Sequence, residues 1–98
     1  MSISKIGSTA FKGYLEIQHK NGSNCFDAKT LDKVVVNGKR RGVFIAGQEV
    51  NGKYTRMLIP YYAISQDKVL AAYKAARNMS DNAVLTLIIN DKCLVKSR

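Results

Sequence analysis

Apolar and polar residues alternate along much of the first sixty positions, and Asn-Gly pairs interrupt the alternation three times. The pairs are Asn21-Gly22, Asn37-Gly38 and Asn51-Gly52. Asn-Gly is typical of the two-residue type I′ turn, because both central residues of that turn need a positive φ. Each pair lies between strand-like segments, so the pattern predicts three β-hairpins and about five strands. The second and third hairpins share the segment 40–50, which predicts an antiparallel meander.

Beyond Pro60 the period of the apolar residues changes from that of a strand to that of a helix. The segment 66–79, QDKVLAAYKAARNM, is rich in alanine and places its apolar residues on one helical face. Ser65 precedes it as a candidate N-cap, and Asp67 in the first turn favours the helix dipole. The sequence therefore predicts one helix at about 66–79.

Two further strands follow this helix. The segment AVLTLIIN, 83–90, is almost wholly apolar, which favours a central strand. Asn90-Asp91 then predicts a turn into the short strand KCLVK, 92–96, so we expect a C-terminal β-hairpin. The order of elements indicates an α+β fold with an antiparallel sheet. A small OB-like β-barrel is the alternative, because that fold also places a helix before its last strands.

The size of the chain fits one domain, 1–98. We expect a flexible N-terminus over 1–10 and frayed ends at 96–98. No apolar run approaches the ~18 residues that span a bilayer, and the first residues lack the apolar stretch of a signal peptide. These features predict a cytoplasmic protein without membrane contact.

Charge changes the picture most. Sixteen Lys and Arg residues against seven Asp and Glu give a net charge of +9. Such an excess favours polyanionic partners, since each neutralised phosphate releases counterions. Nucleic acid is the expected partner, and the alternative is a protein that charge merely keeps soluble.

Three consecutive cations follow the second Asn-Gly pair. A two-residue turn would pair Val36 with Lys39, and the alternation of side chains then places Lys39 and Arg41 on one face. The same counting across the next turn adds Tyr54 and Arg56 to that face. A slip of one residue would exchange the two faces. The opposite face is the predicted core, with Val35, Phe44, Ala46, Val50, Met57 and Ile59.

Cations beside an aromatic ring suit single-stranded nucleic acid, because the cations contact phosphates and a base stacks on the ring. Ordinary solvated turn residues give the same local pattern, and that alternative stays open. Arg40 lies near enough to the turn to reach either face. The candidate nucleic-acid-binding residues are Lys12, Tyr14, Lys39, Arg40, Arg41, Lys53, Tyr54 and Arg56.

The sequence carries no catalytic constellation. His19 is the single histidine and has no nucleophile motif beside it, the acidic residues are scattered, and no phosphate-binding glycine loop occurs. Cys25 and Cys93 lack metal-binding spacing, so we expect two free thiols and neither a metal nor a cofactor.

These observations predict a non-enzymatic protein that binds single-stranded DNA or RNA with little sequence preference. One alternative is a small basic inhibitor, of the kind found in phages or plasmids, that docks on an acidic protein partner. Another is a small basic ribonuclease toxin. We also expect a homodimer, because the strand KCLVK can lie at an exposed sheet edge and pair with a second copy.

Overall fold

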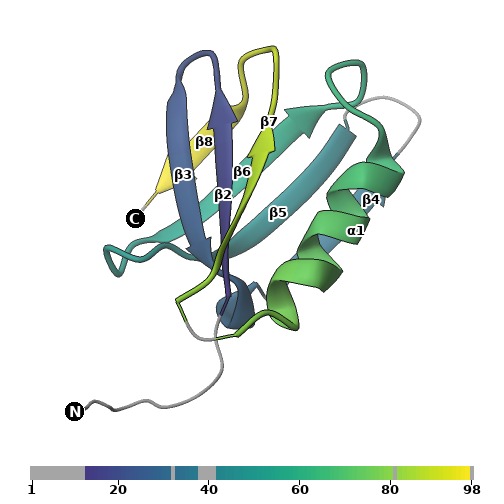
Figure 1. The fold of residues 1–98 in the computed structure, drawn as a ribbon. Helices are drawn as coiled ribbons and strands as arrows, with labels where there is room; N and C mark the ends of the chain where they lie inside the picture. The colour runs from purple at the N-terminus through teal and green to yellow at the C-terminus, as the bar shows by residue number, and fades with distance from the viewer. Residues whose placement is uncertain (1–12, 32, 38–41, 81, 98) are drawn as a thin grey trace, which may run out of the picture.

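A computed structural model describes residues 13–31, 33–37, 42–80 and 82–97 of the chain. Seven strands, a 3₁₀ turn and one α-helix occupy this part of the chain (Figure 1). The predicted α+β class is confirmed. In chain order the elements are β2 (Tyr14–His19), β3 (Gly22–Asp27), η1 (Ala28–Thr30), β4 (Lys33–Asn37), β5 (Gly42–Gln48), β6 (Tyr54–Pro60), α1 (Gln66–Arg77), β7 (Val84–Ile88) and β8 (Leu94–Ser97).

The described strands form two sheets. One has three strands in the order β3-β2-β7, and the other has four in the order β4-β5-β6-β8. Neighbouring strands are antiparallel except β2 and β7, which are parallel. The predicted meander is present as β4-β5-β6. The sheets do not close into a barrel, so the OB-like alternative is wrong.

The predicted C-terminal hairpin is also wrong, because β7 pairs in the three-stranded sheet and β8 in the four-stranded sheet. The connecting segment crosses between the sheets instead of turning back. Ile89 donates its N–H to Gln18 O at 2.7 Å, and Asn21 bonds the backbone N–H and C=O of Cys93. Ile89 and Cys93 are both buried. β7, predicted to be central, is the last of the three strands in its sheet among the residues that the structure describes.

The three hairpins exist, but none has the predicted register. His19 pairs with Gly22, so Lys20 and Asn21 form the first turn. Asn37 pairs with Gly42, which leaves four residues between the paired positions rather than two. Gln48 pairs with Tyr54 across the third turn, again one residue from the prediction. The assumed pairing of Val36 with Lys39 is therefore wrong, and Val36 pairs with Val43.

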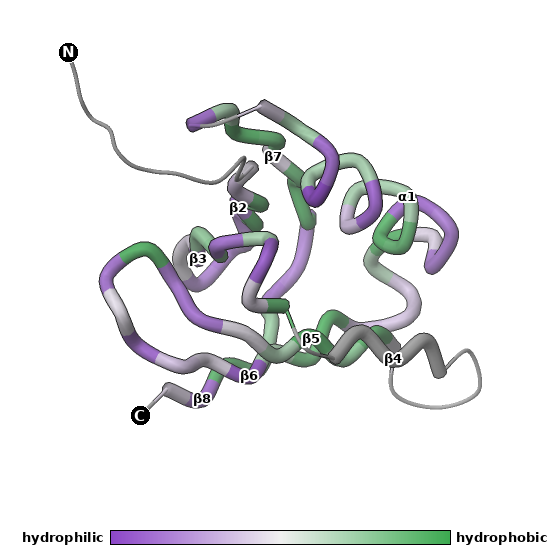
Figure 2. Tube along the Cα trace, turned by 90° about the horizontal axis from the view of Figure 1, so that it is seen from below, coloured by the Kyte–Doolittle hydropathy of each residue, from purple (hydrophilic) through white to green (hydrophobic). Residues whose placement is uncertain are grey.

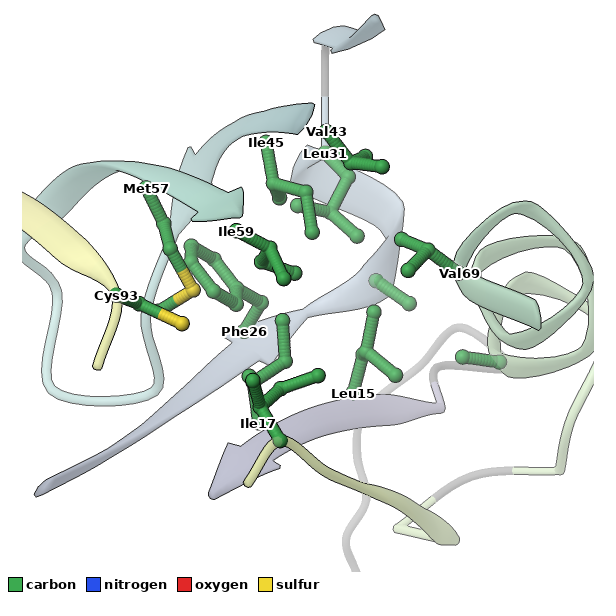
Figure 3. Packing of buried hydrophobic residues seen from close by; sticks show 13 residues of the cluster. Leu15, Ile17, Phe26, Leu31, Val43, Ile45, Met57, Ile59, Val69 and Cys93 are labelled. Carbon is green, nitrogen blue, oxygen red and sulfur yellow. The ribbon is translucent and has the colours of Figure 1, made fainter. Parts of the chain in front are cut away.

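The hydrophobic core lies between the two sheets, and α1 closes one side of it (Figure 2). The close-up in Figure 3 shows side chains from β2, β3, β5 and β6 pointing toward one another. Phe44 was predicted to be in the core and is instead half-buried, and Val50 is exposed. Among the described residues, the apolar ones without exposed surface are Leu15, Ile17, Phe26, Ala28, Val43, Ile45, Met57, Ile59, Val69 and Ala76.

The helix α1 matches the predicted segment, ending at Arg77 with Asn78 as the C-cap. Ser65 is the N-cap residue, but its side chain makes no capping hydrogen bond. The helix buries Val69 and Ala76 against the sheets. Across the described residues, none of the helical structure has the length and apolar character needed to cross a membrane.

Candidate nucleic-acid interface

The four-stranded sheet has one face on the core and one face turned away from it. Val43 and Ile45 of β5 are fully buried, as are Met57 and Ile59 of β6, so the residues between them point outward. Val95 of β8 packs on the core in the same way. We call the opposite side the outer face. Its residues in β5, β6 and β8 are Phe44, Ala46, Gln48, Tyr54, Arg56, Leu58, Leu94 and Lys96.

Strand register arranges the outer face in rows. Arg56 lies between Ala46 and Lys96 in the register, so two exposed cations occupy neighbouring strands. The backbones of neighbouring strands are about 4.8 Å apart. Lys33 of β4 occupies the next register position, opposite Ala46. This row carries exposed cations at Arg56 and Lys96, and Ala46 beside Arg56 is buried, at 2% exposed.

A second row, apolar throughout, runs beside the basic one. Phe44 lies opposite Leu58, and Leu58 lies opposite Leu94. Leu94 is 71% exposed, whereas Phe44 and Leu58 are half-buried. Tyr54, opposite Gln48, lies on the other side of the basic row. Tyr54 of β6 and Phe44 of β5 therefore lie in the rows on either side of the basic row, with Phe44 diagonal to Arg56 and separated from Lys96 by β6.

The structure brings together only some of the predicted site residues. Tyr54 and Arg56 share the outer face, and Lys53 is exposed in the adjacent turn, where its N–H donates to Asn51 Oδ1 at 2.9 Å. Tyr14 lies in the other sheet, opposite Asp27. The remaining four candidates, Lys12, Lys39, Arg40 and Arg41, lie outside the described residues.

Sequence reasoning missed Phe44 and did not use Lys96 as a site residue. Phe44 was placed in the core because the assumed turn shifted β5 by one position. Gly47 carries the signal that corrects this error. A Cβ at that position would lie 2.8 Å from Leu31 Cδ2, so Gly47 faces the interior. Because side chains alternate along a strand, Ile45 and Val43 face the interior as well.

A chain of polar side chains joins the two sheets beneath this face. His19 contacts Asn21 Oδ1 at 2.5 Å and Asn24 Oδ1 at 2.7 Å through its two ring nitrogens. Asn24 Nδ2 donates to both carboxylate oxygens of Glu49 at 3.3 Å, and Thr55 donates to the same carboxylate. Both ring nitrogens of His19 are therefore in polar contact with asparagine side chains.

Both cysteines are free thiols. Burial, reinforced by the negative charge of Asp91, raises the pKa of Cys93 to about 11. Burial also raises the pKa of Cys25, with the charges of Glu16 and Glu49 acting in the same direction. Neutral thiols of this kind are weak nucleophiles and metal ligands. In the portion of the chain that the structure covers, no three His, Cys, Asp or Glu side chains gather to hold a metal ion.

The outer face carries groups that suit binding of phosphates and bases. Two adjacent cations can hold phosphates, and the rings of Phe44 and Tyr54 offer surfaces to nucleobases. Comparisons of the chain with known protein families, characterised proteins and solved structures gave no match.

Proposed function

We propose that this protein binds single-stranded nucleic acid across the outer face of the four-stranded sheet, without catalysing a reaction. The observation that carries the proposal is the register that sets Arg56 beside Lys96 and places Tyr54 and Phe44 in the rows on either side of Arg56. A phosphate backbone running along the basic row would meet both cations. Its bases would fall on the aromatic rings to either side.

Two kinds of energy support binding by this face. Each phosphate contact releases counterions, and the net charge of +9 adds long-range attraction. Stacking of a base on an aromatic side chain contributes about 1–3 kcal/mol. Single strands expose the faces of their bases, whereas a duplex hides them within the stack, so the half-buried ring of Phe44 favours single strands.

The proposal includes a cytoplasmic location. Free thiols persist in reducing compartments, and both Cys25 and Cys93 are free. In an oxidising compartment a pair of free cysteines would be exposed to oxidation whenever the chain unfolds.

Fluorescence anisotropy with single-stranded and double-stranded oligonucleotides, over a series of salt concentrations, tests the proposal. We expect tighter binding of the single strand and a linear fall of log K with log salt. The double variant Arg56→Gln/Lys96→Gln should reduce the slope by about 1.4, because each lost phosphate contact on a single strand contributes about 0.7.

A matched variant separates local contacts from overall charge. Lys68→Gln/Lys74→Gln removes the same charge from exposed positions of α1, away from the outer face. It should change the slope by much less than Arg56→Gln/Lys96→Gln. Equal effects would assign binding to net charge alone, and absence of binding at low salt would overturn the proposal in favour of an acidic protein partner.

A further inference from the structure

Tyr61 and Tyr62 are two adjacent aromatic residues that neither the core nor the outer face accounts for. Tyr61 is 48% exposed and Tyr62 is 69% exposed. Their rings meet edge to face, with the ring centroids 5.6 Å apart and an angle of 83° between the ring planes. Single exposed apolar residues are common on protein surfaces, whereas a pair of exposed rings forms a small aromatic surface and is a candidate binding site.

The turn that carries the two rings is anchored at both ends. Ala63 donates its N–H to Pro60 O at 3.0 Å, so residues 60–63 form a tight turn with the tyrosines at its two central positions. Ile59 before the tyrosines is fully buried, and Ile64 after the turn packs against the core. The rings are therefore presented to solvent by an anchored segment between β6 and α1 (Figure 1).

This turn continues directly from the outer face of the four-stranded sheet. Pro60 is an outward-facing residue of β6, because the alternation of side chains places it on the same side as Arg56 and Leu58. It lies in the next outward-facing row beyond the row of Phe44 and Leu58. The two tyrosines follow Pro60 in the chain, so the aromatic pair stands at the end of the outer face.

Charge and ring chemistry both favour nucleobases as the occupant of this aromatic pair. The chain has a net charge of +9, and Arg56 and Lys96 lie side by side on the same face. A strand whose phosphates contact these cations brings its bases close to the turn. Every nucleobase has a π-face, so an aromatic side chain binds bases with little sequence preference. The edge-to-face contact also orients the two rings in advance, which lowers the entropy that stacking costs.

We propose that Tyr61 and Tyr62 form a second stacking subsite for the bases of the bound strand, an inference that rests on the proposed function. A strand that leaves the basic row on the side of Phe44 passes Pro60 and places a later base against the tyrosine pair. At about 3.4 Å per residue of β6, roughly 14 Å separates Arg56 from Pro60. About four stacked nucleotides cover that distance. The pair thus adds a base contact that the basic row does not provide.

The test is a thermodynamic cycle between a tyrosine ring and the bases of the strand. Fluorescence anisotropy measures the affinity of wild type and Tyr62→Ala for a thymidine strand of about 12 nucleotides and for an abasic strand of the same length. On the thymidine strand Tyr62→Ala should bind about 5-fold to 150-fold more weakly, the range expected for one lost base stack. On the abasic strand the two proteins should bind equally, since no base is present to stack.

Two further variants define what the ring supplies. Tyr62→Phe retains the aromatic face and should keep most of the affinity for the thymidine strand. The matched control is Ile88→Ala, which removes a large side chain that is 63% exposed on β7, in the other sheet. It should bind both strands as wild type does. Melting temperatures check that each variant is folded, as substitution of an exposed side chain predicts.

The failures are distinguishable. Equal affinity of wild type and Tyr62→Ala for the thymidine strand overturns the stacking subsite and leaves the proposed function standing. An equal loss on the thymidine and abasic strands overturns it as well, because the ring would then not act on bases. If wild type binds neither strand at low salt, the proposed function itself falls.

Discussion

Phe44 is an aromatic residue of the four-stranded sheet that faces away from the core, and its ring borders the basic row of Arg56 and Lys96. If a base stacks on it, Phe44→Ala should weaken binding of single strands by about 1–3 kcal/mol and leave the salt slope unchanged. Anisotropy titrations at two salt concentrations measure both quantities.

Leu58 provides the control for this prediction. It lies opposite Phe44 in the same row and is also half-buried, but it offers no aromatic surface. Leu58→Ala should therefore weaken binding by less than Phe44→Ala. Equal losses in the two variants would mean that apolar contact, and not stacking, is what Phe44 supplies.

Thr55 is a polar residue within the core. Its hydroxyl donates to the buried Glu49 carboxylate and lies 2.9 Å from Ser97 Oγ. Thr55→Val keeps the shape but removes a donor from a buried carboxylate, so we expect a loss of about 1–3 kcal/mol in the free energy of unfolding. Ser97→Ala, at an exposed position where water can replace the hydroxyl, should cost less. Urea denaturation measures the free energy of unfolding of both variants. A larger loss in Ser97→Ala than in Thr55→Val would contradict the prediction.

Cys93 should make the stability of the folded protein depend on pH in the alkaline range. Its pKa is about 11 in the folded protein, against an ordinary value of 9.0. Well below pH 9 the thiol is neutral in both the folded and the unfolded chain, so its titration does not change the free energy of unfolding. Between about pH 9 and pH 11 the unfolded chain loses the proton first, and the stability of the folded state falls.

Urea denaturation of wild type and Cys93→Ala at pH 8 and pH 11 checks this expectation. The decline between the two pH values should be smaller in Cys93→Ala than in wild type. Each protein is compared with itself at the two pH values, so the constant cost of the small cavity left by Cys93→Ala cancels. The titration of lysines is common to both proteins and cancels as well. Parallel declines would show that Cys93 does not contribute.

At the level of elements, Gly42 is the residue that sets how β5 meets β6. It has φ +132°, and a Cβ would lie 1.8 Å from Ile59 O. Gly42→Ala should therefore cost about 3 kcal/mol or more in unfolding free energy, since the backbone of β6 has to move. Gly52 also has a positive φ, +92°, but a Cβ there would meet nothing within 4 Å. Gly52→Ala should cost about 1 kcal/mol.

Thermal denaturation of the two glycine variants separates crowding from backbone strain. Both share the strain of a positive φ, so the difference between them reports the close approach of β5 to β6. Similar melting temperatures would indicate that β6 shifts at little cost.

Local patterns predicted the elements better than their pairing. The Asn-Gly pairs located three hairpins and the alanine-rich segment located α1, because both signals lie within a few residues. The register depended on turn length, and a turn longer than two residues between Asn37 and Gly42 shifted β5. As a result, Tyr54 and Arg56 were assigned to the correct face, whereas Phe44 was not.

For the whole molecule, the division into two sheets had no local signal. The sequence predicts that β7 pairs with β8, because only a short segment separates the two strands. Instead, β7 pairs with β2 and β8 pairs with β6. Such choices depend on contacts between distant parts of the chain, and on the burial of Ile89 and Cys93 in the segment that connects them.

The shared core predicts that the two sheets unfold together. Leu15 of β2 and Ile45 of β5 belong to one cluster of buried residues. Leu15→Ala should cost about 2–5 kcal/mol and accelerate hydrogen exchange in the slowest amides of β2 and β5 alike. Exchange in β5 that stays at the wild-type rate would show that the four-stranded sheet is stable by itself.

The parallel pair of β2 and β7 also decides when the fold can form during synthesis. Tyr14 pairs with Val84, seventy positions further along the chain. At about 5–20 residues per second, a ribosome needs roughly 4–14 s to make the intervening residues. Once Asp27 has been made, and for most of that time, the β2–β3 hairpin has Leu15, Ile17 and Phe26 but lacks β7 beside β2. The nascent chain therefore presents an apolar hairpin for several seconds, a suitable target for a chaperone that holds unfolded segments.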